Sequence, residues 1–296
     1  MVKTLGLAIL SASLLGAQSP DVSGLWKSDL QKSKIAGPPI KEYLLSVEQK
    51  EGVFNRRTGE KAPQITETSE TIGEHGEHRS ELTFFTNGKP TVRPFEGVPA
   101  ELTGSVEGDT IVLNGAMAGE PSTFKRTYEL SSDRKTLTIN MVSTDKGKER
   151  QSRYVLSKQP DSAAELFRKP EETAEQHFKN VKTGLKTLPQ SQFIDQMRYI
   201  AWSLDKNCEF CHVRTDFSLD DKKEKKTARK MIDMAIAIDR DNFEGHPAVR
   251  CFTCHQKHAH PLSYPLFPDQ IAEQKAAEQK AMENATPPSP NPSAPK

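Results

Sequence analysis

The sequence has little net charge, few cysteines and only one long apolar run. Its 41 basic residues almost balance its 40 acidic residues, which leaves a formal net charge of +1 over 296 residues. That balance argues against a protein that binds nucleic acid or an anionic membrane through a general positive field. All four cysteines lie between residues 208 and 254, so none near the N-terminus is available for lipid attachment.

The long apolar run stands at the N-terminus. Residues 1–17 read MVKTLGLAILSASLLGA, with Lys3 before the apolar stretch and small residues at its end. This pattern is typical of a cleaved secretory signal peptide, with an uncleaved anchor as the alternative, and the run is short for a membrane span. We therefore expect an exported protein, periplasmic in a Gram-negative organism, with no transmembrane span after cleavage.

The rest of the sequence predicts two domains, of which the first, residues 18–159, is all-β. Its short stretches rich in Val, Ile, Thr, Tyr and Phe are separated by turn signals such as Glu107-Gly108-Asp109. The stretches are YLLSVEQ, RSELTFFT, DTIVLNG, FKRTYELS, KTLTINMVST and RQSRYVLS. They predict an antiparallel barrel or sandwich. The opening DVSGLWKSDLQKSK resembles the first strand of lipocalin-like domains. His75 and His78 are interpreted as residues of a polar loop.

Residues 160–268 have helical periodicity and form the second predicted domain, which is mainly α. In SQFIDQMRYIAWSL, apolar residues fall on one face of a helix that includes Met197. A second long helix is predicted to begin near Ser218, its expected N-cap. The basic run from Lys222 to Lys230 is either a solvated helix face or a docking surface for an acidic partner. Residues 269–296 become Pro-rich and are predicted to be a disordered tail.

The four cysteines occur in two Cys-x-x-Cys-His motifs, at Cys208-Cys211-His212 and Cys251-Cys254-His255. In c-type haem attachment each cysteine thiol adds across a haem vinyl group, and two intervening residues match the spacing of the two vinyls. The adjacent histidine then gives its imidazole nitrogen to the iron. Two copies in an exported chain predict two covalently attached haem c groups.

Three other interpretations of the cysteines are weaker. A zinc site needs four ligands in one tetrahedron, and the two pairs lie farther apart than in most zinc ribbons. Disulfides form in an oxidising compartment, but neither zinc nor disulfides explain the histidine that ends each motif. A thioredoxin-like pair would follow a strand rather than stand among helices.

A methionine on the helix before each motif is a candidate for the sixth iron ligand. Met197 precedes the first motif, and Met231 and Met234 precede the second. A thioether ligand raises the reduction potential relative to a second histidine. A methionine on a helix face also serves core packing, and periodicity does not separate Met231 from Met234.

The stretch FKNVKTGLKTLPQSQFIDQMRYIAWSLDKNCEFCHV, with TARKMIDMAIAIDRDNFEGHPAVRCFTCHQ, resembles the cytochrome subunit of photosynthetic reaction centres, and more closely its small dihaem relatives. The resemblance covers roughly residues 171–261 and implies Met197 as the distal partner of His212 and Met231 as that of His255. The reaction-centre subunit carries four haems, whereas this chain has motifs for two. His246, His258 and His260 gain no firm role from the resemblance.

These observations predict an electron-transfer protein rather than an enzyme, carrying single electrons between redox partners that the sequence does not identify. Ligation by histidine and methionine closes both axial positions of the iron and leaves no place for a substrate. The alternatives are a peroxidase-like haem enzyme with one open haem and a zinc-binding module with four cysteine ligands. In a further interpretation, the β-domain binds or docks a partner.

Overall fold

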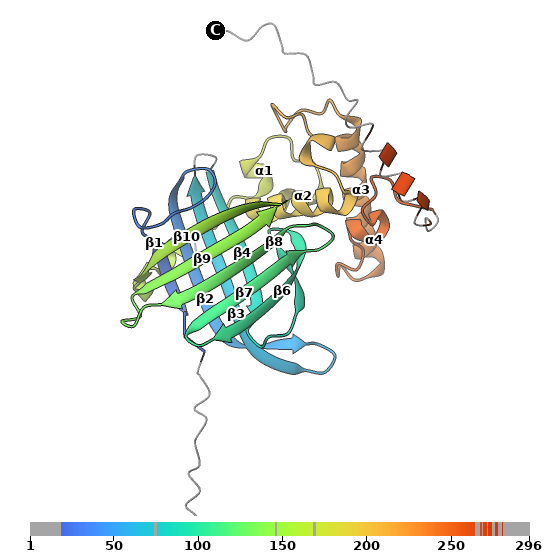
Figure 1. Ribbon diagram of the computed structural model, residues 1–296. Helices are drawn as coiled ribbons and strands as arrows, with labels where there is room; N and C mark the ends of the chain where they lie inside the picture. The colour runs from blue at the N-terminus through green and yellow to red at the C-terminus, as the bar shows by residue number, and fades with distance from the viewer. Residues whose placement is uncertain are drawn as a thin grey trace, which may run out of the picture.

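A computed structural model describes residues 19–73, 76–145, 147–167 and 170–263, together with residues 267, 269–270, 272–273, 276–277 and 280. The predicted signal peptide, His75 and most of the predicted tail lie outside the described residues. The described chain consists of a β-barrel followed by a segment of helices and loops that packs against one side of the barrel (Figure 1).

Ten antiparallel strands form one sheet. They are β1 (Gly24–Ser28), β2 (Ile40–Asn55), β3 (Glu60–Gly73), β4 (Gly76–Phe85), β5 (Thr91–Phe95), β6 (Val98–Glu107), β7 (Thr110–Met117), β8 (Thr123–Leu130), β9 (Thr136–Asp145) and β10 (Lys148–Gln159). Their order is β4-β3-β2-β1-β10-β9-β8-β7-β6-β5, so β1 pairs with β10 and all other neighbours are consecutive. The edge strands β4 and β5 contact each other, and the sheet curls into a nearly closed barrel (Figure 1).

Of the two predicted forms of the β-domain, the chain adopts the barrel. Each of the six predicted stretches falls within a strand or extends one residue beyond it, namely in β2, β4, β7, β8, β9 and β10. Strands β3, β5 and β6 were not predicted. Strand β3 buries two glutamates, Glu67 and Glu70, which interrupt its apolar alternation. Strands β5 and β6 pair Pro94 with Pro99, and proline is a poor strand signal.

The inward side chains of the barrel fill its interior. The fully buried ones include Trp26, Leu45, Ile65, Phe84, Leu102, Ile111, Leu113, Tyr128, Leu137 and Leu156. The Trp26 indole also donates a hydrogen bond to the Val22 carbonyl at 3.0 Å, which satisfies its N–H inside the core. Because nearly every strand contributes to this single cluster, burial of apolar surface drives closure of the barrel.

A buried ion pair interrupts this apolar interior. Glu67, 3% exposed, accepts a hydrogen bond from Arg126 Nη1 at 3.1 Å. The Arg126 guanidinium also lies over the rings of Phe95 and Phe124, 5.4 and 5.7 Å from their centroids. Burial raises the pKa of the Glu67 carboxyl, and the Arg126 charge opposes that rise. The carboxylate is therefore stable in the core only while its arginine partner is present.

We expect Glu67→Gln to lower the free energy of unfolding by about 3–5 kcal/mol, because it leaves the Arg126 charge buried without its counter-ion. The double variant Glu67→Leu/Arg126→Met removes both charges and should cost less than the single change. Urea unfolding of the three proteins measures both effects. A double variant less stable than Glu67→Gln would contradict this description of the pair.

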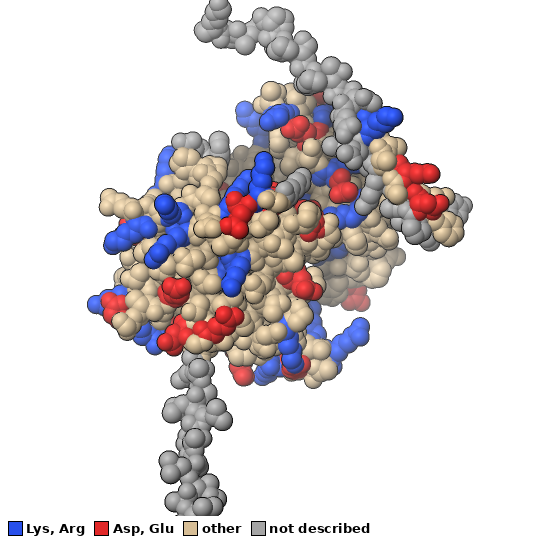
Figure 2. All heavy atoms as spheres, in the orientation of Figure 1, with Lys and Arg blue, Asp and Glu red and all other residues tan. Residues whose placement is uncertain are grey.

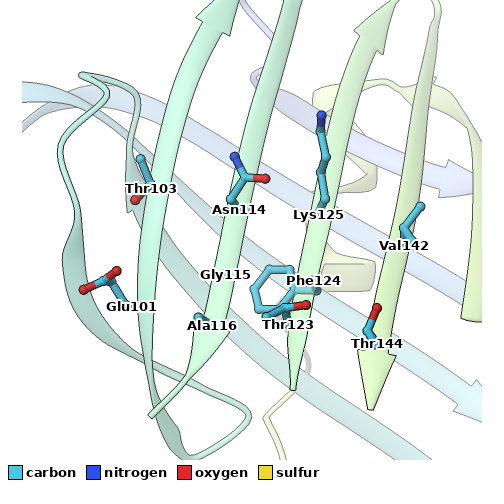
Figure 3. A pocket seen from close by; sticks show the side chains of 10 residues that line it. All are labelled: Glu101, Thr103, Asn114, Gly115, Ala116, Thr123, Phe124, Lys125, Val142 and Thr144. Carbon is cyan, nitrogen blue, oxygen red and sulfur yellow. The ribbon is translucent and has the colours of Figure 1, made fainter. Parts of the chain in front are cut away.

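The outer surface of the barrel is polar and mixed in charge. Figure 2 shows basic and acidic side chains interspersed over the visible face, in keeping with the small net charge. A shallow hollow of about 360 Å³ lies on the outer wall of β6–β9, between side chains that include Glu101, Asn114 and Lys125 (Figure 3). None of its lining residues belongs to a cysteine motif.

The segment after β10 contains two long helices joined by short helices, turns and loops. Its elements are η1 (Asp161–Phe167), α1 (Ala174–His177), η2 (Gly184–Thr187), α2 (Gln190–Leu204), η3 (Cys208–Phe210), α3 (Lys223–Asn242) and α4 (Cys251–His255), where η marks a 3-10 turn. Loops make up much of this segment. The structure therefore supports a segment with a few helices, but it does not clearly confirm the predicted mainly α domain. Among the described residues, no helix is long and apolar enough to cross a membrane.

The start of α3 differs from the prediction. The helix begins at Lys223 with Lys222 as its N-cap, rather than at Ser218. The Ser218 carbonyl instead accepts a hydrogen bond from the Asn180 side chain, and the Ser218 N–H donates to Asp216 Oδ1 at 2.8 Å. Both bonds are made by backbone atoms of Ser218, and they hold this residue in the loop before the helix.

Helix α2 is fixed to the barrel at both ends. At its start, Glu171 Oε2 accepts the Ser191 N–H at 3.0 Å, while Glu171 Oε1 lies 3.6 Å from Arg79 on β4. At its end, the Trp202 indole N–H donates to the Ala118 carbonyl, just after β7, at 2.8 Å. Trp202 is also largely buried. The orientation of α2 therefore depends on the barrel.

The β5–β6 turn touches the middle of α2 so closely that only glycine fits. Gly97 has a positive φ of +81°, and a Cβ added there would lie 2.3 Å from the Asp195 carbonyl oxygen. Gly108, in the β6–β7 turn, also has a positive φ (+62°) but has open space around it. A substitution at Gly108 therefore introduces backbone strain alone, whereas one at Gly97 introduces both strain and a collision with α2.

We expect Gly108→Ala to lower the free energy of unfolding by about 1–2 kcal/mol, the cost of a left-handed alanine. Gly97→Ala should cost about 2–5 kcal/mol, because overpacking against α2 is added to the same strain. Chemical denaturation of both variants provides the comparison. An equal decrease in the free energy of unfolding for both variants would show that the close contact between the turn and α2 does not affect stability.

Candidate functional site

The first cysteine motif is a single turn that follows the C-terminal end of α2. Asp205 ends the helix with a left-handed backbone, φ 54°. The His212 N–H then donates to the Cys208 carbonyl at 2.9 Å, which places Cys208, Cys211 and His212 on one turn. Cys208 is exposed and Cys211 is half-buried. Burial raises the pKa of the Cys211 thiol and so favours its protonated form.

The second motif forms the short helix α4, which packs against α2. Phe252 stacks on Trp202 with ring centroids 4.9 Å apart, and the Lys257 N–H donates to the Ser203 carbonyl at 2.9 Å. Cys251 is half-buried and Cys254 is exposed. Because the first motif directly follows α2 and the second packs against it, one helix supports both.

Each motif histidine has one ring nitrogen bonded to a backbone carbonyl. His212 Nδ1 lies 3.0 Å from the Phe217 oxygen, and His255 Nδ1 lies 2.9 Å from the His258 oxygen. A carbonyl oxygen only accepts hydrogen bonds, so Nδ1 carries the hydrogen and Nε2 keeps its lone pair. Both rings are therefore held in the tautomer that binds a metal ion through Nε2.

His212 is also held in its neutral form. Burial lowers the pKa of its ring, and the nearby cations Lys225, Arg229 and Lys222 act in the same direction, while the bond to the Phe217 carbonyl opposes them. A neutral imidazole is the state that ligates a metal ion.

The positions of the candidate methionines do not show which of them could bind iron. Met197 is half-buried on α2, the helix that leads into the first motif. Met231 and Met234 lie on α3 and are 40% and 47% exposed. Their burial does not separate Met231 from Met234, so the choice of distal ligand still depends on the family resemblance.

The part of the chain around the motifs exposes apolar side chains. Between residues 207 and 263 the exposed ones are Phe217, Leu219, Met231, Met234, Ile236, Phe243, Phe252 and Leu262. From residue 170 to residue 263, by contrast, the buried apolar side chains in the described chain are Ala174, Trp202 and Leu204. The exposed apolar side chains are available to pack against a bound apolar group. This composition, together with paired thiols and an available Nε2 in each motif, fits a flat apolar macrocycle bound through thioether links and axial iron ligands.

Among the described residues, no other histidine forms a group of three or more possible metal ligands with either motif. His246 and His260 are exposed, and His258 contributes its backbone carbonyl rather than its ring. The prediction of a polar loop is wrong for His78, which lies on strand β4 and pairs with Thr71 of β3. In the described chain, no group of three or more His, Cys, Asp or Glu side chains is arranged to hold a metal ion. The two cysteine pairs therefore do not converge on one point as a Cys₄ zinc site requires.

Sequence reasoning missed the atoms that orient the two histidines. The Phe217 and His258 acceptors are backbone oxygens, which leave no side-chain signal in a sequence. Lys225 was interpreted as part of a solvated or partner-docking run, yet it is only 8% exposed. In the sequence, Lys225 is one of several neighbouring lysines, and nothing in the pattern distinguishes it from the others.

Comparison with known families identifies one match. The family described as photosynthetic reaction centre cytochrome C subunit matches residues 134–294, which is more than half of the chain. The match is longer than the stretch that carries the resemblance and includes β9 and β10 of the barrel. The comparison with curated proteins found no match.

Several solved structures align with about half of the chain. They include a REP1-NXSQ fatty acid transporter (10% identity, TM-score 0.33, covering 47% of this chain and 96% of that chain). Another is a point mutant of the fluorescent protein UnaG (14%, 0.32, 47% and 96%). A third is secretory abundant heat soluble protein 4 from Ramazzottius varieornatus (16%, 0.30, 48% and 99%). At such identities and TM-scores, these likenesses carry no inference about ligands or function.

Proposed function

This chain belongs to the photosynthetic reaction centre cytochrome c subunit family, and on that premise we propose that it is an exported dihaem c-type cytochrome that passes single electrons between redox partners. The observation that carries the proposal is the matched pair of histidines, each with Nδ1 bonded to a carbonyl and Nε2 available to iron. A cytochrome c family implies covalently bound haem c, and the number two comes from the two motifs. Family membership by itself assigns no role in photosynthesis.

Within this proposal each residue has a defined task. Cys208 and Cys211 anchor the first haem, and Cys251 and Cys254 anchor the second. Each thiol would add across one vinyl group of the haem, its sulfur to one carbon and its hydrogen to the other, which needs no oxidant. Nε2 of His212 and of His255 would bind the iron, and Met197 and Met231 would supply the second protein ligand of each. Haem supplies reversible one-electron chemistry at its iron.

The protein's own contribution is to hold the ligands still and to exclude other chemistry. The carbonyl bonds of the two histidines fix both ring orientation and tautomer. Ligation by both a histidine and a methionine would leave no coordination position for a substrate, which favours electron transfer over catalysis. Since α2 contacts both motifs, it would support both haems on one structural element.

Each cysteine pair should attach one of the two haems, independently of the other pair. When the chain is produced with the haem-attachment machinery, the pyridine haemochrome assay should give two haems per chain. Cys208→Ser/Cys211→Ser and Cys251→Ser/Cys254→Ser should each give one. His260→Ala, which changes an exposed histidine beside the second motif, should still give two. A colourless protein, or one that purifies with zinc, would sink the proposal.

Replacing Met197 with Ala should open one axial position on the first haem, because no thioether then faces the iron. The reduced variant should bind carbon monoxide at one haem, seen as a new difference spectrum, and that haem's reduction potential should fall. Met141→Ala in the barrel is the matched control and should bind none. Carbon monoxide binding by the unaltered protein would instead favour a haem enzyme with an open site.

A further inference from the structure

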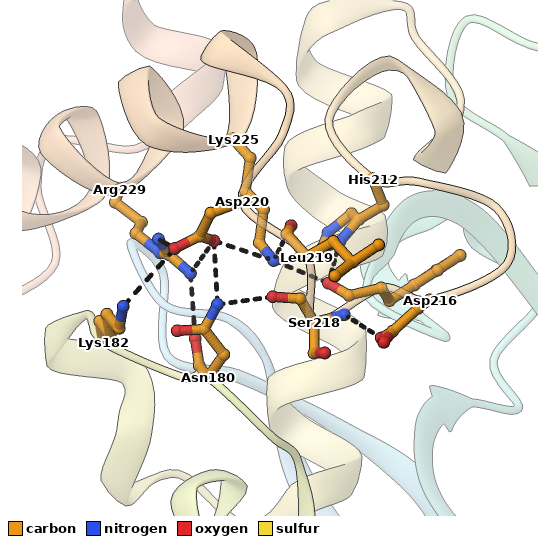
Figure 4. A network of polar contacts seen from close by, with 10 residues as sticks. Asn180, Lys182, His212, Asp216, Ser218, Leu219, Asp220, Lys225 and Arg229 are labelled. Atoms are coloured by element: carbon orange, nitrogen blue, oxygen red, sulfur yellow. Dashed lines mark hydrogen bonds and ion pairs between the residues drawn. The ribbon is translucent and has the colours of Figure 1, made fainter.

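A buried lysine lies beside the histidine of the first motif. Lys225 is on the first turn of α3, and its Nζ donates to the Phe217 carbonyl at 2.7 Å and to the Leu219 carbonyl at 2.8 Å (Figure 4). Lysine is rarely buried unless its charge is satisfied. Here two backbone oxygens and a carboxylate, Asp220 Oδ1 at 3.4 Å, satisfy it.

The lysine and the histidine share one acceptor. The Phe217 oxygen that takes the Lys225 hydrogen bond is the same atom that takes the His212 Nδ1–H bond, at 3.0 Å. A carbonyl oxygen has two lone pairs and accommodates both donors. The ammonium polarises that oxygen, however, and makes it a weaker acceptor for the imidazole N–H. Lys225 therefore acts on His212 through a single backbone atom.

The cluster around the lysine carries positive charge. Asp220 accepts from Arg229 at 2.9 Å and faces Lys182 at 3.5 Å as well as Lys225 (Figure 4). The hydrogen bond from Arg229 holds the pKa of Asp220 far below its ordinary value, so the carboxylate stays ionised. Three cations thus surround one anion. Asp216, on the same loop, is exposed and its charge is screened by solvent.

We propose that Lys225 is a positioning residue that raises the reduction potential of the haem held by His212. Two effects act in the same direction. A nearby fixed cation disfavours the extra positive charge of ferric iron. A weakened Nδ1–H bond reduces the electron donation from imidazole that stabilises ferric iron. The inference rests on the proposed function, because it requires a haem at Cys208 and Cys211.

The test compares three variants of the full, haem-loaded chain. Lys225→Met keeps the length and apolar stem of the side chain but removes both charge and donor. Lys225→Gln removes the charge and keeps an N–H donor. Lys226→Gln is the matched control, since Lys226 is adjacent on α3, carries the same charge and is exposed. Redox titration followed at the reduced α-band resolves the two one-electron steps.

In Lys225→Met we expect one of the two steps to shift toward ferric iron by about tenfold in its equilibrium constant, which is about 59 mV for one electron. The other step serves as an internal reference and should not move. Lys225→Gln should show a smaller shift of the same sign, and Lys226→Gln should shift by less than about twofold, because water screens an exposed charge. Equal titration curves for Lys225→Met and Lys226→Gln would overturn the inference.

Haem content separates this inference from the proposed function. Absence of haem from the unaltered chain removes the proposed function itself. Two haems per chain with an unmoved potential in Lys225→Met removes only the role of the lysine. If both Lys225 variants lose the first haem while Lys226→Gln keeps it, the lysine holds the loop rather than setting a potential, and the inference is wrong.

Discussion

The indole of Trp202 joins the three working parts of the molecule. Its N–H is bonded to the Ala118 carbonyl of the barrel, and its ring stacks on Phe252 of the second motif. The Lys257 ammonium lies over the same ring, 4.2 Å from its centroid, and faces Glu120 at 3.8 Å. The C-terminal end of α2, the barrel and the second cysteine motif therefore all contact one side chain, so the packing of Trp202 fixes their relative placement.

The sequence predicted the parts of the structure that follow simple periodicity. Alternating apolar residues located most strands, and the motif Cys-x-x-Cys-His located two short helical turns. The strand β3 was hidden because Glu67 and Glu70 occupy positions that an apolar residue would normally fill. Their arginine partners, Arg126 and Arg79, lie on other strands, and no local pattern reports a partner that pairs across the sheet.

The site also combines features that depend on neighbouring residues with features that depend on the tertiary fold. The tight turn of each motif is formed by residues close together in the sequence, so the residue types of the motif predict it. The acceptors of His212 and His255 are backbone atoms, and the buried state of Lys225 depends on a loop that crosses over the start of α3. A run of lysines on a helix looks solvated in sequence, and only the fold distinguishes Lys225 from its neighbour Lys226. For this reason the two motifs could be located from the sequence, whereas the carbonyl oxygens bonded to their histidines and the burial of Lys225 could not.

The pairing of β1 with β10 joins the first and last strands of the barrel. This pairing joins Leu25 to Gln159, so the barrel closes only after its last strand has been made. Pairing between such distant segments is slow, whereas helices form from local contacts. The surface that receives α2 includes Gly97 in the β5–β6 turn and Ala118 just after β7, so α2 packs against a part of the folded barrel. A barrel that folds slowly would delay assembly of the cysteine motifs, although no barrel residue belongs to either motif.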